Sequence, residues 1–341
     1  MTERNNRTIT IDRQRAASLP AMAAVLRRPQ GFEVEQQSPP AIKPSELLVR
    51  MAGCGICASN LPVWQGRPWF HYPFPTGAPG HEGWGEIVEI GHRLRRLLPE
   101  LRYGQQVTVL HDRAFAGYAA LSVRDVVPLP ASLAGEPFPG EAIGCAMNIF
   151  RRADIREGQF VAIIGAGFLG LLLVQLAVAA GARVLVLTRR KSARDLAPGY
   201  GAEAAFDTED WWGNGQRVME MTGGRGCPRV VEATGLQFAL DLATEIVAEY
   251  GRLVIAGYHQ DGPRQVNMQK WNWRAIDVVN AHERDRRRIV QGVADGIAAA
   301  EKGRLRVREL LTHRFHLDRL NDGFRMMAER PDGFIKGWVQ L

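Results

Sequence analysis

The chain has 341 residues, 46% hydrophobic and 23% charged, a composition that excludes a disordered or fibrous protein. Its formal net charge of +7 is too small an excess for a dedicated nucleic-acid-binding protein of this length. The four cysteines, at positions 54, 57, 145 and 227, are too few for a disulfide framework and suit a reducing compartment. The length favours two domains, at about 150 residues each.

The N-terminal segment, residues 1–20, is polar and lacks the apolar core of a secretory signal. Its acidic residues Glu3 and Asp12 argue against a transit peptide. The most apolar stretch, Val161–Leu187, is interrupted by glycines and by Arg183, which favours a buried core over a membrane span. We therefore expect a cytoplasmic protein with no membrane partner.

The first part of the folded chain is predicted to be rich in β-strands joined by long loops. Apolar or alternating patterns predict strands at Met22–Arg27, Leu47–Met51, Trp84–Gly91 and Gln106–Leu110. Between these strands lie a loop rich in glycine and cysteine, residues 54–60, and a loop rich in proline and aromatic residues, residues 64–79.

From Phe160 onward, strands and helices alternate. An apolar strand, Val161–Ile164, precedes a glycine-rich turn, and an apolar helix, Leu171–Ala180, leads to the strand Val184–Leu187. Continuous apolar strands are typical of a parallel sheet covered on both faces, so we expect an α/β fold with a doubly wound sheet. Later segments predict further strands and helices at Arg229–Glu232, Leu253–Ala256, Ile289–Lys302, Leu317–Ala328 and Gly333–Val339.

The turn between the first of these strands and its helix predicts a dinucleotide site of the Rossmann type. Its sequence is Gly165-Ala166-Gly167-Phe168-Leu169-Gly170. The first glycine permits the tight turn, the second lets a pyrophosphate approach the backbone, and the third lets the helix lie close to the sheet. The helix N-terminus then offers free N–H groups to the phosphates.

The end of the following strand indicates which cofactor binds. A carboxylate there would hydrogen-bond the ribose 2′-hydroxyl of NAD and repel the 2′-phosphate of NADP. This chain has Thr188, Arg189, Arg190 and Lys191 instead. Guanidinium groups suit a phosphate dianion, so we expect NADP to be preferred over NAD.

Three separate loops carry residues suited to a metal. Cys57, His81 and Cys145 offer two thiolates and one imidazole. Two cysteines and one histidine with an open fourth position form a ligand set of catalytic rather than structural zinc, as the alcohol dehydrogenases illustrate. Cys54 and Cys227 lack such neighbours in the sequence and are interpreted as small packing residues.

Five short motifs follow one another along the chain. They are Gly55-Ile56-Cys57 with Ser59, Gly80-His81-Glu82, Gly144-Cys145, the glycine-rich turn and Glu232-Ala233-Thr234-Gly235. The chain thus resembles the zinc-dependent medium-chain dehydrogenases/reductases of the alcohol and polyol dehydrogenase branch. The resemblance implies a GroES-like, β-rich catalytic domain of residues 1–146 and 284–341. It also implies a Rossmann domain of residues 147–283, which places Thr234 and Gly235 at the cofactor.

By the same resemblance, Cys57, His81 and Cys145 hold zinc. Glu82 is a neighbouring carboxylate that can reach the metal, and Ser59 passes the substrate proton towards solvent. The implied reaction is hydride transfer between a nicotinamide and an alcohol, polyol or sugar hydroxyl, or the reverse reduction of a carbonyl. A homodimer or homotetramer is implied as well.

The sequence departs from the family at three places. No cysteine lies between Cys57 and Cys145, so we expect one catalytic zinc and no structural zinc. Asn60 replaces a usual aspartate, and an amide can hydrogen-bond a ligand without adding charge. Pro62 replaces a histidine of the usual proton relay, so a proton leaving Ser59 must pass through the cofactor ribose or water.

The substrate is a small molecule that the sequence does not name. Trp64, Trp69 and His71 follow Ser59 and are candidate walls of its pocket, since aromatic groups stack on sugars or enclose apolar alcohols. Two alternatives stay open at this point. One is a zinc-free quinone or enone reductase of the same superfamily, and the other is a nucleotide-binding protein without catalysis.

Overall fold

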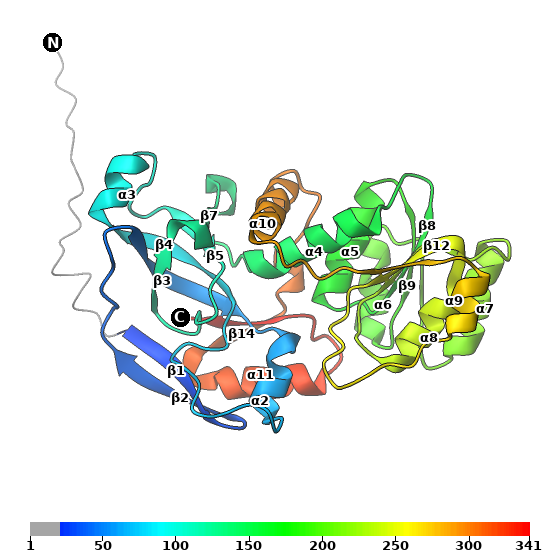
Figure 1. Ribbon diagram of the computed structural model, residues 1–341, viewed down its shortest axis with the longest axis horizontal. Coiled ribbons are helices and arrows are strands. Elements are labelled where there is room, and N and C mark those ends of the chain that lie inside the picture. Colours follow the sequence, from blue (N-terminus) through cyan, green and yellow to red (C-terminus); the bar gives the residue numbers. More distant parts are fainter. Residues whose placement is uncertain (1–20) are drawn as a thin grey trace, which may run out of the picture.

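The computed structural model describes residues 21–341, which form two lobes joined by a pair of adjacent helices (Figure 1). These helices are α4 (Gly140–Ala153) and α10 (Arg286–Glu301), which pack against each other. The N-terminal segment, interpreted above as neither a signal nor a transit peptide, lies outside the described residues. Among the described helices, none combines the length and the apolar character that crossing a bilayer requires.

The first lobe is built on a seven-stranded sheet and a separate hairpin. The hairpin pairs β1 (Ala21–Arg28) with β2 (Gly31–Gln37). The larger sheet has the order β14-β15-β3-β4-β5-β7, and β6 also pairs with β3. Its strands are β3 (Glu46–Gly55), β4 (Glu82–Ile90), β5 (Gln106–Val109), β6 (Tyr118–Ser122), β7 (Val126–Pro128), β14 (His313–His316) and β15 (Gly337–Gln340).

Alternating burial explains why this sheet encloses a core. Leu47, Val49 and Met51 of β3 point to the same side as Val107 and Val109 of β5, and all are almost completely buried. The side is closed by α11 (Leu320–Glu329), whose apolar face joins the same core, and by the short helices α2 (Leu61–Gln65) and α3 (His92–Leu97).

The end of the chain returns to this lobe. Strand β15 runs antiparallel to β3, with Val339 opposite Cys54, and Ile56 N donates to Gly337 O at 2.9 Å. The last residues of the chain are therefore fixed beside the loop that carries Cys57.

The second lobe is a six-stranded parallel sheet with helices on both faces. Its order is β10-β9-β8-β11-β12-β13, so the winding reverses between β8 and β11. The strands are β8 (Phe160–Ile164), β9 (Arg183–Leu187), β10 (Ala204–Phe206), β11 (Cys227–Glu232), β12 (Val247–Ile255) and β13 (Asp277–Asn280). The helices are α5 (Phe168–Ala179), α6 (Lys191–Leu196), α7 (Trp211–Met221), α8 (Gln237–Ile246) and α9 (Met268–Trp273). The predicted doubly wound α/β sheet is confirmed.

Candidate active site

Three potential metal ligands meet where β3 and β4 end side by side. The register pairs Gly55 of β3 with Glu82 of β4, which brings Cys57, the second residue after β3, next to His81, the residue before β4. One ligand atom from each of Cys57, His81 and Glu82 lies within 4.8 Å of the others. Thiol, imidazole and carboxylate are donors that zinc accepts, so this group fits the metal that the sequence predicts.

The imidazole of His81 is held by its Nδ1 atom. Pro79 O lies 3.1 Å from Nδ1, and Asn60 Nδ2 lies 3.3 Å from it while donating to Pro79 O at 2.8 Å. A carbonyl can only accept, so the proton belongs on Nδ1 and Nε2 is left for a metal. Asn60 thus contacts a candidate ligand without adding negative charge, as expected from the sequence.

Negative groups surround this imidazole. Burial by itself lowers the pKa of His81, but Cys57, Glu141 and Glu82 outweigh it and raise the pKa to about 10. The same field that stabilises a second proton, on His81 Nε2, stabilises a metal cation, which displaces this Nε2 proton when it binds while Nδ1 keeps its own.

Helix α4 brings two further donors to the site, Glu141 and Cys145. Cys145 Sγ lies outside the group of three ligands and donates to Glu141 Oε1 at 3.2 Å, one helical turn away. Burial raises the pKa of Glu141, and burial together with Glu141 raises that of Cys145 well above its usual value. Sequence analysis did not single out Glu141, although an acid four residues before a candidate ligand on an apolar helix is a usable signal.

Lys336 is a second residue of the site that sequence analysis missed. It is buried directly before β15, and its Nζ donates to Glu82 Oε1 at 2.7 Å. The same Nζ lies 5.0 Å from the ring centroid of Phe168, in the glycine-rich turn. Lys336 therefore connects the candidate metal group to the candidate cofactor loop.

The candidate proton-transfer residue Ser59 lies at the same group. It belongs to a single 3-10 turn, Ala58–Asn60, and its Oγ donates to Cys57 Sγ at 3.2 Å. Pro62 follows at the start of α2 and is buried, so the short helix offers no titratable side chain at that position.

The glycine-rich turn has the geometry that a dinucleotide requires. Gly165 has φ +100°, and a Cβ on Gly170 would lie 1.9 Å from Gly165 O. A Cβ on Gly167 would meet only Arg190, at 3.7 Å, so the space above this residue is open to a ligand. Ala166 is buried, and Phe168 and Leu169 begin α5. The turn therefore fits the pyrophosphate of a nicotinamide dinucleotide.

The residues after β9 differ in how they are held. The Thr188 side chain is almost completely buried, and Arg189 is exposed. The guanidinium of Arg190 donates to Ala166 O at 3.0 Å and also to Phe334 O. Arg190 is thus fixed beside the glycine-rich turn, and Arg189 is free to meet a ligand.

Thr234 and Gly235 lie across the winding reversal from the glycine-rich turn. Thr234 N and Oγ1 and Gly235 N all donate to Oε1 of the fully buried Glu232. A Cβ on Gly165 would lie 2.5 Å from Thr234 Cγ2, so the two loops are in contact.

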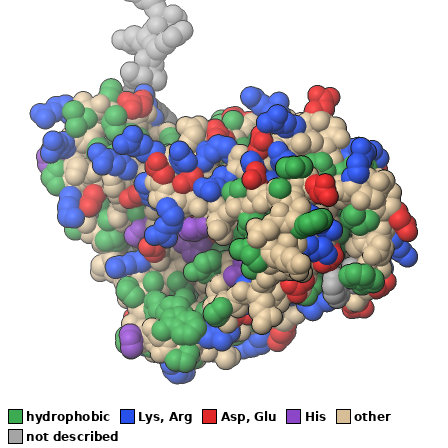
Figure 2. Space-filling model, turned by 45° about the vertical axis from the view of Figure 1, so that its right-hand side comes forward, with side chains coloured by type: hydrophobic (Ala, Val, Ile, Leu, Met, Phe, Trp, Pro, Cys, Tyr) green, Lys and Arg blue, Asp and Glu red, His purple; other side chains and the backbone are tan. Residues whose placement is uncertain are grey.

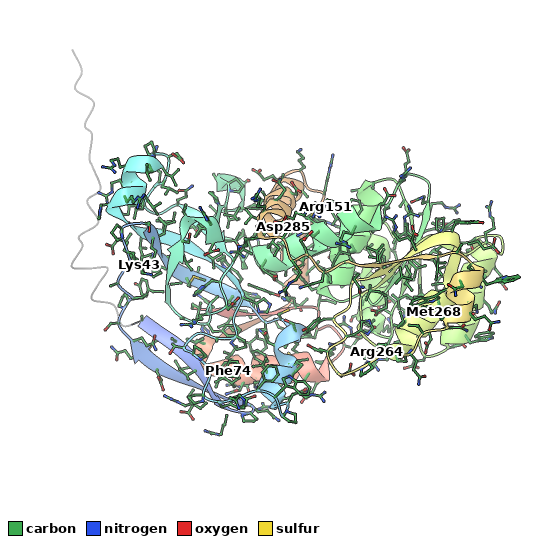
Figure 3. The ribbon with its side chains drawn as sticks, in the orientation of Figure 1. Lys43, Phe74, Arg151, Arg264, Met268 and Asp285 are labelled. Carbon is green, nitrogen blue, oxygen red and sulfur yellow. The ribbon has the colours of Figure 1, made fainter. Side chains whose placement is uncertain are left out.

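The loop after β12 reaches from the second lobe to the first (Figure 1). His259 Nε2 lies 3.0 Å from Glu232 Oε2, and Arg264 Nε donates to His259 Nδ1 at 2.8 Å. Gln260 Nε2 donates to Ala58 O at 3.4 Å, next to Cys57. Figure 3 shows Arg264 in this loop between the lobes, and Figure 2 shows histidine side chains gathered near the junction of the lobes.

The three candidate pocket walls are placed differently. Trp64 is 3% exposed, stacks on Phe324 at 5.7 Å between centroids and donates to Asn321 Oδ1 at 3.3 Å. It is a residue of the core, which corrects the expectation that it borders an open pocket. Trp69 is 59% exposed and His71 is exposed, so both remain available to a ligand.

Two family descriptions match the chain in its two lobes. "Alcohol dehydrogenase GroES-like domain" matches residues 43–131, and "Zinc-binding dehydrogenase" matches residues 169–297. The two matches together span more than half of the chain. They confirm the GroES-like assignment of the first lobe.

Curated relatives match over almost their entire length. An L-threonine 3-dehydrogenase of Ruegeria pomeroyi is 28% identical, over 90% of this chain and 96% of its own. An L-galactonate-5-dehydrogenase of Escherichia coli is 24% identical, over 92% of this chain and 97% of its own. Among solved structures, a putative zinc-binding dehydrogenase of Sinorhizobium meliloti bound to NADP superposes with a TM-score of 0.79 at 24% identity, over 95% of this chain and 100% of that one.

Proposed function

The chain belongs to the zinc-dependent medium-chain alcohol and polyol dehydrogenases, which transfer a hydride between an alcohol carbon and a nicotinamide cofactor, and on this premise we propose its substrate, cofactor and site residues. The proposed substrate is a small polyol or sugar derivative, oxidised at a hydroxyl with NADP and one zinc ion per chain. The observation that supports this most is the group of Cys57, His81 and Glu82, whose ligand atoms lie within 4.8 Å of one another.

The proposed metal site uses residues from the loop after β3, from the start of β4 with the residue before it, and from helix α4. Cys57 Sγ, His81 Nε2 and a donor of helix α4, Cys145 or Glu141, would hold the ion. One oxygen of Glu82 would take the fourth position, which the substrate oxygen needs when it binds. Pro79 O keeps the proton on His81 Nδ1, since it lies 3.1 Å away. A zinc ion in this site supplies Lewis-acid polarisation of the substrate oxygen.

Ser59 is proposed to take the substrate proton. Its Oγ lies 3.2 Å from Cys57 Sγ, so it faces the metal group directly. A hydroxyl accepts and donates in the same position, which moves a proton without burying a charge. Pro62 cannot continue the relay, so the proton passes on through water or the cofactor ribose.

The cofactor is proposed to lie with its pyrophosphate over Gly167 and its adenosine ribose at the end of β9. The absence of a carboxylate at Thr188, together with the exposed Arg189, favours the 2′-phosphate of NADP. Thr234, Gly235 and the metal group would then border the nicotinamide half of the cofactor, because dinucleotides bind across the winding reversal of such sheets.

The proposed substrate class follows from two observations. The names of the two curated relatives both describe small hydroxylated acids, L-threonine and L-galactonate. The loop of Trp69 and His71 offers an exposed ring and an imidazole, groups that stack on and hydrogen-bond a hydroxylated carbon chain.

A screen of purified protein tests the proposal. We expect NADP-linked absorbance changes with members of a panel of polyols, sugars and hydroxy acids, with zinc near one per chain. Turnover of quinones or enones by zinc-free protein would favour the zinc-free reductase, and cofactor binding without turnover would favour the non-catalytic protein.

The proposed assembly is a homodimer formed at the outer edge of the parallel sheet. Strand β13 ends this sheet, and Val278 on it is 37% exposed. Trp273 and Tyr250 near the same edge are 85% and 82% exposed. An open strand edge beside large apolar side chains suits pairing with the same edge of a second copy.

A further inference from the structure

A turn from the first lobe lies against the residues that follow β9 in the second lobe. Ser192 N donates to Asp332 Oδ1 at 3.0 Å, and Gly333 N donates to Ser192 Oγ at 2.9 Å. One residue further, Phe334 O accepts from the guanidinium of Arg190. Two segments more than 130 residues apart are therefore joined at the end of β9, where a dinucleotide places its adenosine ribose.

This junction carries an excess of positive charge. Arg189 and Arg190 come from the second lobe, and Arg330 comes from the turn of the first. Burial and then Arg189 lower the pKa of Arg330, and burial and then Arg330 lower that of Arg190, so the three guanidinium groups lie within electrostatic reach. Like charges gathered in one place favour an anionic ligand between them.

Neighbouring acids do not neutralise Arg189 and Arg330. Asp332 accepts hydrogen bonds from Ser192, which holds its carboxylate in the turn, and Lys191 is paired with Asp195. Within residues 21–341, neither Arg189 nor Arg330 takes part in an ion pair. Arg190 is different, because its guanidinium is bound to Ala166 O and Phe334 O.

The backbone of Arg330 gives an independent reason to assign it a role. Arg330 follows the last residue of α11 with φ 49° and ψ 56°, and its N–H donates to Met326 O at 2.8 Å. Helices that end in this left-handed conformation usually have glycine there, because a Cβ is strained. A long basic side chain at such a position points to a function that outweighs the strain.

We propose that Arg330 and Arg189 together bind the 2′-phosphate of NADP, so that this phosphate is held by both lobes. Arg190 acts as a positioning residue that fixes the glycine-rich turn against the first lobe. This assignment rests on the proposed preference for NADP and adds a specificity-determining residue outside the parallel-sheet lobe. The ligand chemistry is that of a phosphate monoester dianion on a ribose.

The test compares Arg330→Gly and Arg330→Ala with the unchanged protein. Affinities are measured by calorimetry for NADP, NAD, 2′,5′-ADP and 5′-AMP. We expect both variants to bind NADP and 2′,5′-ADP about tenfold more weakly, as for loss of one charge-assisted contact, while NAD and 5′-AMP change less than about twofold. Arg330→Gly should also raise the thermal midpoint, because glycine relieves the strained conformation.

Arg325→Ala is the matched control, since Arg325 lies on the same helix, is exposed and is ion-paired to Asp322. It should leave all four affinities unchanged. If the unchanged protein prefers NADP, but Arg330→Gly and Arg330→Ala bind it normally, the role of Arg330 is overturned and the proposed function stands. If the unchanged protein binds 2′,5′-ADP no more tightly than 5′-AMP, the preference for NADP and the role of Arg330 are both overturned.

Discussion

Lys336 Nζ donates to Glu82 Oε1 at 2.7 Å, and both side chains are buried. Glu82 begins β4, and Lys336 directly precedes β15 near the end of the chain. Burial by itself lowers the pKa of Lys336, but Glu82 and Cys57 outweigh it and raise that pKa. Whenever the metal is absent, the contact therefore provides the hydrogen-bonded positive partner of this buried carboxylate, which otherwise faces only the imidazole of His81.

Replacement of this lysine should destabilise the metal-free protein. With a chelator present, Lys336→Met is expected to lose about 3–5 kcal/mol of unfolding free energy, because it leaves a buried carboxylate without a partner. Urea denaturation followed by fluorescence measures this loss. The double variant Glu82→Gln/Lys336→Met should recover most of it, and the exposed Lys302→Met should lose nothing. An unchanged midpoint for Lys336→Met would show that the pair contributes no stability.

Lys336 and Glu141 also show why two residues of the site were missed from the sequence. The motifs around Cys57, His81 and Gly165 are local, so their spacing predicts a metal group and a dinucleotide turn. Lys336 reaches Glu82 across 254 residues, through the pairing of β15 with β3, and no spacing predicts such a contact. Glu141 reaches the site only because α4 begins beside it, and this helix was not among the predicted elements.

The aromatic loop, residues 64–79, and the edge strands illustrate a second limit of prediction from the sequence. Trp64 and Trp69 occur in the same segment, but Phe324 of α11 buries the first, and nothing local distinguishes them. Strands β13 and β14 have four residues each, too few to show an alternation. The longer apolar strands of the parallel sheet were predicted correctly because they are buried on both faces.

Removal of a proposed ligand should remove the metal. Cys57→Ser is expected to lower zinc content from near one per chain to below about a tenth and to abolish turnover, since a neutral hydroxyl replaces a thiolate. Plasma emission spectrometry measures the metal, and calorimetry should show that NADP still binds. Cys54→Ala, at a buried cysteine three residues earlier, should keep its zinc. Full zinc occupancy in Cys57→Ser would contradict the assignment.

The fourth protein donor is decided by two substitutions on α4. Cys145→Ser removes the thiol, and Glu141→Gln removes the carboxylate whose Oε1 lies 3.2 Å from it. The variant that loses a ligand should bind zinc about 10–100-fold more weakly, or lose it, in competition with a chelator. The other variant should shift the affinity less. Equal zinc affinity in both variants would show that α4 supplies no ligand.

Gln260 should affect turnover more than stability. Its Nε2 makes a long hydrogen bond to Ala58 O, while its Oε1 is buried without a partner. In Gln260→Met, the lost hydrogen bond destabilises the fold, whereas removal of a buried acceptor without a partner stabilises it. The unfolding free energy should therefore change by less than about 1 kcal/mol. Turnover should fall about tenfold, because the contact places the loop after β12 beside the metal group. Gln265→Met, at an exposed position of the same loop, should leave turnover unchanged.

The two tryptophans of the aromatic loop should separate packing from substrate binding. Trp64→Ala is expected to cost about 3–5 kcal/mol of unfolding free energy, because it empties a core position stacked on Phe324. Trp69→Ala should change stability by less than about 0.5 kcal/mol, since its ring is exposed, but should raise the KM for the substrate. Thermal unfolding and steady-state kinetics measure the two effects. An unchanged KM in Trp69→Ala would remove Trp69 from the pocket.

The proposed dimer depends on an open strand edge. Val278→Arg places a charge on β13, where pairing with a second copy would bury it, and an unpaired buried charge is costly. Light scattering should show a dimer for the unchanged protein and a monomer for the variant. Met22→Arg is the control, because Met22 is 43% exposed and lies in the other lobe. It should remain dimeric. A monomeric unchanged protein would contradict the assembly, and a dimer that persists in Val278→Arg would place the interface elsewhere.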